Sequence, residues 1–260
     1  MSGITITDLT WKVKNRIDPI LHDVSLHLPE GEFYGIIGPN GSGKTSLIRQ
    51  IMKLQQPDQG TIRINDRLLS ELNRSQLAKL ASFMSQNRQN QIDFIVQDVV
   101  AMGREPYRKR FSPLQHSDHE QINEALELTK CESLREQKLK HLSAGELQRV
   151  IIARTIAQDT PWILLDEPIS NLDIRYQIEL MQIFDELYRH KGKTIVMILH
   201  DLNLAMKYCT KLILIDEGSV YAYGDKKDVL TKENLEAVYQ MKFRFVEDDE
   251  EKCAYLMPEL

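Results

Sequence analysis

A glycine-rich segment near the N-terminus, residues 38–45, constrains the fold more than any other part of the chain. It reads GPNGSGKT and matches the pattern G-x-x-x-x-G-K-[ST]. A continuous apolar stretch, GEFYGII, precedes it, and a run with helical spacing, LIRQIMKL, follows it. A strand, a glycine-rich turn and a helix in this order form a phosphate-binding loop, because the backbone N–H groups of the turn point inward around an anion. The segment therefore predicts a nucleotide site.

Each position of this loop has an expected role. The glycines allow the tight turn, Lys44 reaches the β- and γ-phosphates, and the Thr45 hydroxyl is a ligand for Mg²⁺. A nucleotide and Mg²⁺ are therefore the expected ligands. The predicted nucleotide-binding residues in the loop are Gly38, Pro39, Asn40, Gly41, Ser42, Gly43, Lys44, Thr45 and Ser46.

Two carboxylates follow a second apolar strand in WILLDEP. Asp166 closes that strand, where a carboxylate is costly unless it serves a cation, and Mg²⁺ is the expected cation. Glu167 comes next and is the candidate general base for the water that attacks the γ-phosphate. Together with the phosphate loop, this pair indicates nucleotide hydrolysis.

A second helix start has the character of an anion site. In HLSAGELQRV, Ser143 is followed three residues later by Glu146 and then by an apolar run with helical spacing, which is typical of a capping box. Helix starts favour anions, because their N–H groups are unpaired and their dipole is positive. A chain that already has a phosphate loop does not need this second site for its own nucleotide.

Composition excludes several classes. The chain has 260 residues and a net charge of −5, and its Lys and Arg residues are scattered, so nothing indicates a nucleic-acid partner. The start, MSGITITDLT, is no signal peptide, and no apolar run approaches the ~20 residues that cross a bilayer. We expect a cytosolic protein that works at a membrane only through another chain.

Strand and helix patterns alternate along most of the chain. This alternation predicts an α/β fold with a mainly parallel sheet wrapped by helices. From about residue 87 to residue 157 the pattern becomes helical, which indicates an inserted helical lobe. Three local features are also expected: a capping box of Ser117 with Glu120, a hairpin turn at 216–219, and a solvated loop at the acidic run 247–251.

The motifs GPNGSGKTS, LSAGELQRV, ILLDEP, SNLD and ILHD occur in the order found in the ATP-binding subunits of ABC transporters, and the chain resembles that family over nearly its whole length. The resemblance implies a P-loop NTPase (RecA-like) cassette with a mainly parallel sheet, an antiparallel β subdomain and an inserted helical subdomain. It places a single ATPase domain at 2–240, with the helical subdomain at about 88–157, and a C-terminal extension at 241–260.

The same resemblance accounts for the second anion site. In the family two cassettes pack head to tail, and the signature helix of one caps the γ-phosphate held by the other. A second copy of this chain is therefore the implied partner. The residues that would act on that partner's nucleotide are Ser143, Ala144, Gly145 and Glu146.

Three further roles are implied by the family's motifs. Gln86 resembles the glutamine that contacts Mg²⁺ and the attacking water. His200 resembles the switch histidine at the γ-phosphate, and Asp173 resembles the aspartate that crosses the dimer interface. The expected catalytic residues are thus Glu167, His200, Gln86 and Lys44, and the expected Mg²⁺ ligands are Thr45, Gln86 and Asp166.

The segment VVAMGREPY at 99–107 narrows the resemblance to importers of ferric siderophores, haem and cobalamin. Members of that group work at the cytoplasmic face of the cell membrane with two permease subunits and an extracytoplasmic binding protein. We expect residues 93–110 to dock the permease through exposed side chains of Arg104, Tyr107 and Arg108.

The sequence departs from the family pattern at several positions. Ala144 and Glu146 replace the usual glycine and glutamine of the signature, and Ile169 stands where threonine is common. Val13 occupies the spacing of the adenine-stacking aromatic residue. Trp11 lies two residues earlier on the same strand face and is an alternative stacking residue or a core residue.

Two alternatives to the importer are a soluble cassette ATPase and an exporter subunit. A cassette ATPase acting on DNA or ribosomes needs a long coiled coil or a second cassette, and the sequence has neither, whereas a role in Fe–S assembly or another non-transport process stays open. In the family an exporter subunit is usually fused to membrane helices, and no apolar run in this sequence approaches the ~20 residues that such a helix needs. The importer is the favoured hypothesis.

Overall fold

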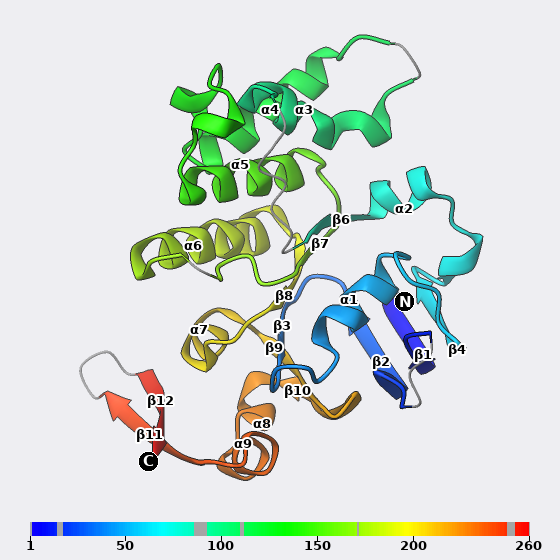
Figure 1. The fold of residues 1–260 in the computed structure, drawn as a ribbon, viewed down its shortest axis with the longest axis vertical. Coiled ribbons are helices and arrows are strands. Elements are labelled where there is room, and N and C mark those ends of the chain that lie inside the picture. Colours follow the sequence, from blue (N-terminus) through cyan, green and yellow to red (C-terminus); the bar gives the residue numbers. More distant parts are fainter. Residues whose placement is uncertain are drawn as a thin grey trace. The chain divides into compact units, whose positions relative to one another are not determined.

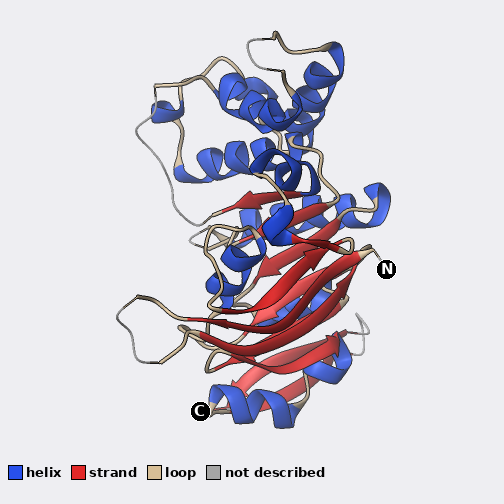
Figure 2. Ribbon diagram, turned by 90° about the vertical axis from the view of Figure 1, so that its right-hand side faces the viewer, coloured by secondary structure: helices blue, strands red, loops and turns tan. Residues whose placement is uncertain are grey.

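The computed structural model describes residues 2–14, 18–85, 93–109, 112–170, 172–248 and 253–259. It divides into two compact units (Figure 1). Unit 1 comprises residues 1–71 and 196–260, and unit 2 comprises residues 72–195. Most strands belong to unit 1 and most long helices to unit 2. Figure 2 distinguishes the strands (red) from the helices (blue).

Unit 1 contains most of the β-structure. Its elements are β1 (Gly3–Trp11), β2 (Leu21–Pro29), β3 (Phe33–Ile37), α1 (Lys44–Ile51), β4 (Gln59–Ile64), β5 (Arg67–Leu68), the 3-10 turn η1 (Leu69–Glu71), α7 (Leu202–Tyr208), β9 (Lys211–Asp216), β10 (Ser219–Asp225), α8 (Lys226–Val229), α9 (Lys232–Tyr239), β11 (Lys242–Asp248) and β12 (Cys253–Glu259).

An antiparallel sheet in the order β2-β1-β4-β5 forms one layer of unit 1. The alternation of apolar and polar residues in β1 and β2 turns one face of each strand inward, where Ile4, Ile6 and Leu26 are at most 6% exposed. This sheet confirms the antiparallel β subdomain.

A second layer of strands carries the phosphate loop. The strand order in this sheet is β10-β9-β3-β8, and β8 spans Thr194–Ile198. The boundary between unit 2 and unit 1 lies within β8, because unit 1 resumes at residue 196. β3 and β9 are parallel, and β9 and β10 form the antiparallel hairpin that was expected at 216–219. All five residues of β3 are buried, as is typical of a strand covered on both faces.

Unit 2 is mainly helical. Its elements are α2 (Arg74–Leu80), β6 (Ala81–Met84), α3 (Val96–Ala101), α4 (His116–Leu128), α5 (Ala144–Ala157), β7 (Trp162–Leu165), α6 (Ile174–Lys191) and the first residues of β8, with the 3-10 turns η2 (Met102–Tyr107), η3 (Glu132–Leu134) and η4 (Leu139–His141). α3, α4 and α5 pack against one another, and β6 and β7 pair in parallel. The helical insertion predicted at about 88–157 lies within this unit.

Two local expectations are wrong. α4 begins one residue before Ser117, so the Ser117–Glu120 pair cannot cap it; instead Gln115 is the N-cap, and its backbone N–H donates to Asp118 Oδ2 at 2.9 Å. The acidic run at 247–251 is not simply a loop, because its first two residues continue β11; residues 249–251 lie outside the described part of the chain.

β11 and β12 form a C-terminal hairpin, paired from Lys242 with Glu259 to Asp248 with Cys253. The side-chain amide of Asn203 in α7 holds this hairpin through two bonds. It donates to Leu256 O at 3.2 Å and accepts from Leu256 N–H at 2.7 Å. The C-terminal extension is thus attached to the rest of unit 1.

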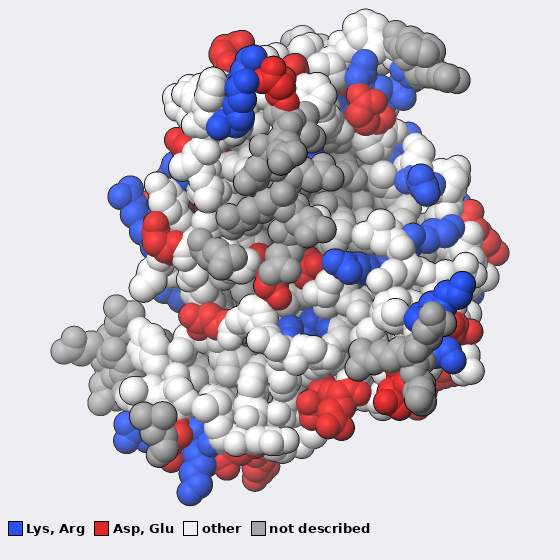
Figure 3. Space-filling model, in the orientation of Figure 1, with Lys and Arg blue, Asp and Glu red and all other residues white. Residues whose placement is uncertain are grey.

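Among the helices that the structure describes, none combines the length and the apolar character needed to cross a bilayer. On the face drawn in Figure 3, the described Lys and Arg side chains are interspersed with Asp and Glu. This distribution agrees with the scattered charges of the sequence.

Candidate functional site

The phosphate loop lies between β3 and α1 in unit 1. Gly38 follows β3 with a φ of 141°, and a Cβ atom there would lie 2.0 Å from the backbone oxygen of Ile215. Gly43 is the N-cap of α1 with a φ of 106°, and a Cβ there would lie 2.9 Å from Ile20 O. Both positions therefore require glycine, for conformation and for space.

Lys44 begins α1 and folds back over the loop. It is 5% exposed, and its Nζ donates to Gly38 O at 2.8 Å and to Pro39 O at 2.7 Å. The N-cap of α1 makes no side-chain hydrogen bond, and Thr45 and Ser46 follow in the first turn, half-buried. A buried cation beside the N-terminus of a helix is suited to a phosphate.

The rest of the loop is more open at its tip. Asn40 and Gly41 are exposed, whereas Ser42 is 4% exposed. The Ser42 carbonyl accepts a hydrogen bond from Gly218 N–H in the β9–β10 turn at 3.0 Å. The turn thereby supports the loop from outside.

His200 and Trp11 also belong to unit 1. The exposed His200 follows β8, whose end is tied to β3 by a bond from Leu199 N–H to Ile36 O at 3.1 Å. His200 therefore lies at the end of the strand beside the one that leads into the phosphate loop. Trp11 is half-buried at the end of β1, and Val13 is 43% exposed.

Asp166 and Glu167 follow β7 in unit 2. The four residues of β7 are buried, and Asp166 is 0% exposed, with its backbone N–H donating to Met84 O at 2.9 Å. Glu167 is half-buried and has a φ of 52°. A left-handed backbone is uncommon for a residue with a side chain and is typical of functional sites. It is stabilised by Ser170, whose hydroxyl donates to Glu167 O at 3.0 Å.

The capping box of α5 is confirmed. The Ser143 hydroxyl accepts from Glu146 N–H at 3.3 Å, and Glu146 Oε2 accepts from the Ser143 hydroxyl at 2.7 Å and from Ser143 N–H at 2.8 Å. These bonds from Ser143 lower the pKa of Glu146, so its carboxyl is an anion at neutral pH. Ser143 and Ala144 are exposed, and a Cβ added to Gly145 would meet nothing within 4 Å.

Asp173 and Gln86 are the two remaining predicted site residues. Asp173 is the exposed N-cap of α6, where its carboxylate accepts from Tyr176 N–H at 3.1 Å. Gln86 lies outside the described residues. Among the described residues, no cluster of three or more His, Cys, Asp or Glu could hold a metal ion by itself.

The expected exposure of Arg104 is wrong. Arg104 is 6% exposed, because its guanidinium pairs with Asp118 and donates to Ala157 O at 2.8 Å. Tyr107 is 36% exposed, and the Cζ atom of Arg104 lies 4.2 Å from the centroid of its ring. Arg108 is half-buried and pairs with Glu105. A buried, paired arginine cannot present its charge to a permease.

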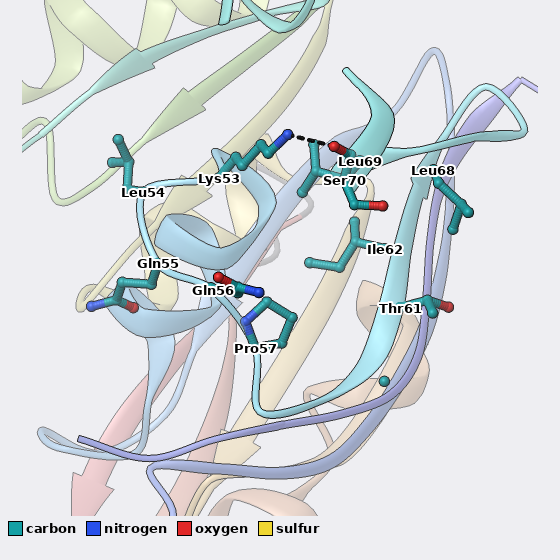
Figure 4. Close-up of a pocket in the computed structure, with 11 residues that line it drawn as sticks. Lys53, Leu54, Gln55, Gln56, Pro57, Thr61, Ile62, Leu68, Leu69 and Ser70 are labelled. Atoms are coloured by element: carbon teal, nitrogen blue, oxygen red, sulfur yellow. Dashed lines mark hydrogen bonds between the residues drawn. The ribbon is translucent and has the colours of Figure 1, made fainter. Parts of the chain in front are cut away.

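A cavity of about 530 Å³ lies in unit 1, between the end of α1 and the β4–η1 segment. Figure 4 draws the residues that line it. Lys53 Nζ donates to Ser70 O across it at 2.9 Å. None of the predicted site residues lines this cavity. No motif in the sequence singles out Tyr239, which lies at the end of α9 and lines a groove together with Pro39 and Ser42 of the phosphate loop.

The chain matches the family described as ABC transporter over residues 21–170, more than half of its length. It is 37% identical over 251 residues to the hemin import ATP-binding protein HmuV of Escherichia coli O157:H7, covering 94% of this chain and 95% of the relative. It is 35% identical over 229 residues to the ferric enterobactin transport ATP-binding protein FepC of E. coli K12, covering 88% and 84%. It is also 35% identical over 248 residues to the probable siderophore transport ATP-binding protein YusV of Bacillus subtilis, covering 95% and 90%.

Two solved structures share the fold. A metal-chelate type ABC transporter in an inward-facing conformation superposes with a TM-score of 0.86 at 23% identity, covering 100% of this chain and 98% of that chain. A dimeric ATP-binding cassette bound to ADP and Pi in a post-hydrolysis state has a TM-score of 0.74 at 28% identity, covering 86% and 98%. The cassette fold is confirmed.

Proposed function

This chain belongs to the ABC transporter family as an ATP-binding subunit that hydrolyses ATP, and we propose that it powers the import of a metal chelate of the siderophore, haem or cobalamin class. One observation carries this proposal. Three relatives named for hemin or siderophore transport align at 35–37% identity with at least 84% of their own length. None of these three is named for Fe–S assembly, so the importer is favoured over that alternative.

The proposed nucleotide site is residues 38–46. Lys44 would exchange the carbonyls of Gly38 and Pro39 for the β- and γ-phosphates, because a phosphate is a stronger acceptor than a backbone carbonyl. The unpaired N–H groups in the first turn of α1 and the positive end of its helix dipole would also favour binding of the phosphates. Trp11 is proposed to stack on the adenine, from the end of β1.

Mg²⁺ suits the donors that the chain offers. The hydroxyl of Thr45 and the carboxylate of Asp166 are hard oxygen ligands, with Gln86 proposed as a third. Because the described residues include no self-sufficient metal cluster, phosphate oxygens and water would have to complete the coordination, as Mg²⁺ sites commonly require. When bound, the ion would neutralise charge that develops on the phosphates.

Glu167 is proposed as the general base. Glu167 directly follows Asp166 and has a left-handed backbone of the kind that is typical of functional sites, which supports a functional role for this carboxylate. It would take a proton from the attacking water, while His200 would contact the γ-phosphate and Gln86 would orient the water.

We propose that the signature residues Ser143, Ala144, Gly145 and Glu146 act on a second copy of this chain, in a head-to-tail dimer. Gly145 supports this idea, because neither its backbone conformation nor its neighbours within the chain require glycine. A small residue at an exposed helix start leaves room for a ligand from outside. Asp173 is proposed to cross the same interface.

The proposed partners are two membrane permease subunits and, indirectly, an extracytoplasmic binding protein, with no nucleic acid. The chain would act peripherally at the cytoplasmic face of the cell membrane. The relative named for hemin import and the relative named for ferric enterobactin transport support this arrangement.

Reconstitution tests the proposal. The chain is assembled with the permease encoded beside it in lipid vesicles, and uptake of a ferric siderophore, hemin or cobalamin is measured with Mg-ATP inside or outside. We expect uptake that needs ATP on the side of this chain and that Lys44→Ala abolishes. Failure to assemble with the permease, or uptake unaffected by Lys44→Ala, would contradict the proposal.

A further inference from the structure

We propose that Gln148, in α5, positions Glu167 of the same chain for its reaction with water. α5 is the helix whose N-cap is Ser143, the first of the signature residues. The inference rests on the proposed function, because it takes Glu167 as the general base. Gln148 is a positioning residue in this account. It would act through the backbone of Pro168 and would not touch the nucleotide.

Gln148 is a polar residue on the buried side of α5. It is 6% exposed, and Leu147 and Ile152 of the same helix are also buried. A buried amide costs free energy unless it is hydrogen-bonded, so an apolar residue would suit this position better if packing were its only role. The Gln148 side chain donates from Nε2 to the carbonyl of Pro168. This bond joins α5 to the segment that follows β7.

Pro168 directly follows Glu167 and depends on that bond. Proline has no backbone N–H, so the carbonyl is its only backbone hydrogen-bonding group. Pro168 is buried, and a buried carbonyl without a partner is costly. Gln148 therefore satisfies this carbonyl and fixes the orientation of the peptide that begins one residue after Glu167.

Three successive carbonyls of this segment accept hydrogen bonds from side chains. The Glu167 carbonyl accepts from the Ser170 hydroxyl at 3.0 Å. The Ile169 carbonyl accepts from Gln177 Nε2 at 3.4 Å. The carbonyl between these two accepts from Gln148. Ser170 belongs to the segment itself and Gln177 to α6, so of these three donors Gln148 is the one that belongs to α5.

The backbone of Glu167 requires support of this kind. Its φ of 52° is left-handed, and a non-glycine residue keeps such a conformation only where the surrounding structure holds it. α5 is a helix of 14 residues that packs against α3 and α4, so it is a firmer support than the segment itself. We infer that the Gln148 bond keeps the Glu167 carboxylate in its working position.

Arg149, the next residue of α5, makes a second contact with the same part of unit 2. Its Cζ atom lies 5.1 Å from the centroid of the Tyr176 ring in α6. Tyr176 N–H donates to Asp173 Oδ1, the N-cap of α6, at 3.1 Å. α5 therefore contacts the chain after β7 at two points. In the proposed dimer this helix would serve two ATP sites, with Ser143 at the partner's nucleotide and Gln148 behind the base of its own chain.

This arrangement predicts an effect on chemistry and not on nucleotide binding. Without the Gln148 amide, the segment that carries Glu167 would lose one support, and a small displacement of a catalytic group lowers kcat. The phosphate loop lies in unit 1 and is unchanged by the substitution, so its affinity for nucleotide should persist. A residue that matters only for packing would lower Tm and leave kcat of the folded protein unchanged.

The test compares Gln148→Met with Gln158→Met. Both substitutions remove a side-chain amide of α5 and keep an unbranched side chain of similar length. Gln158 is the C-cap at the other end of the helix, where its Nε2 donates to Ala78 O at 2.6 Å. For each variant we would measure kcat for ATP, Kd for Mg-ADP, Tm, and hydrogen exchange of residues 166–173 without nucleotide.

We expect Gln148→Met to lower kcat about 3- to 30-fold, less than removal of the base itself, with Kd for Mg-ADP unchanged. Hydrogen exchange of residues 166–173 should become faster, because this segment loses a support. Gln158→Met should keep the wild-type kcat and the wild-type exchange in these residues. Gln148→Leu is a second apolar replacement and should behave as Gln148→Met does.

A wild-type kcat in Gln148→Met and Gln148→Leu would overturn the inference, as would an equal loss of kcat in Gln158→Met. A lower kcat with unchanged exchange of residues 166–173 would also overturn it, because the effect would not pass through this segment. Glu167→Gln separates this failure from failure of the proposed base. If Glu167→Gln turns over at the wild-type rate, the base is wrong; if it is inactive while Gln148→Met is normal, only the role of Gln148 is wrong.

Discussion

Arg104 Nε donates to Asp118 Oδ1 at 2.9 Å inside unit 2, where the two side chains are 7% and 6% exposed. The same guanidinium donates to the carbonyl of Ala157, the last residue of α5. Asp118 in turn accepts the N-cap N–H of α4 from Gln115. Arg104 therefore connects η2, the start of α4 and the end of α5, and its charge holds the helical lobe together.

Loss of Arg104 should destabilise the lobe. Arg104→Met keeps much of the apolar stem but leaves Asp118 buried without its cation, which typically costs about 3–5 kcal/mol. Unfolding in urea, followed by far-UV circular dichroism, measures the change. Arg175→Met is the matched control, because Arg175 is 83% exposed and pairs with Glu179 on the surface, and it should cost less than about 1 kcal/mol. Equal effects of the two substitutions would contradict the structural role.

The Arg104–Asp118 pair also predicts a pH dependence. Burial acts to raise the pKa of Asp118, but the hydrogen bonds from Gln115 N–H and Arg104 outweigh it and lower the pKa below its usual value. A depressed folded-state pKa contributes stability above the unfolded-state value of about 4, and this contribution is lost as the pH falls through the folded-state pKa. The difference in unfolding free energy between wild type and Asp118→Asn should thus be constant from pH 7 to about 5 and shrink below about pH 4. A difference that grows in acid would show the opposite sign of shift.

Glu167→Gln tests the proposed general base. The amide keeps the shape of the side chain but cannot accept a proton from water, so kcat should fall by about 10²–10⁴. Binding of Mg-ATP should persist, because the phosphate loop is unchanged. Steady-state hydrolysis and equilibrium binding measure the two effects separately. Wild-type turnover in Glu167→Gln would rule out the assignment.

Local features of the structure could be predicted where their cause is local. The glycines of residues 38–43 and the apolar run before them define a strand, a turn and a helix start within a few residues. Ser143 and Glu146 are three residues apart, so their capping box depends only on α5 itself. The turn between β9 and β10 is likewise set by neighbouring residues.

Features that depend on distant partners could not be predicted. Arg104 looks like a surface arginine until α4 brings Asp118 beside it, 14 residues later. Gln115 displaces Ser117 as the N-cap, with Asp118, the partner of Arg104, accepting its N–H. Tyr239 lines a groove with Pro39, which lies 200 residues earlier in the chain, and no pattern in the sequence links the two. The composite roles proposed for Ser143 and Asp173 depend on a second chain and stay predictions.

The central claim is that each ATP site is completed by the signature helix of a second chain. Ser143→Arg should block that contact by its bulk while nucleotide still binds to the chain's own phosphate loop. Lys44→Ala should lose nucleotide binding but keep its signature helix. Each variant alone should therefore be inactive, and ATP-dependent dimerisation, followed by light scattering, reports whether mixed dimers form.

The most direct measurement is the ATPase rate of Lys44→Ala chains mixed with an excess of Ser143→Arg chains. In a mixed dimer one site carries both lesions, whereas the other pairs an intact phosphate loop with an intact signature helix. We predict that mixing restores hydrolysis well above the sum of the separate rates, while Glu167→Gln in the Ser143→Arg chain abolishes the recovery. Normal dimerisation and turnover by Ser143→Arg alone, or no recovery in mixed dimers that demonstrably form, would contradict the account.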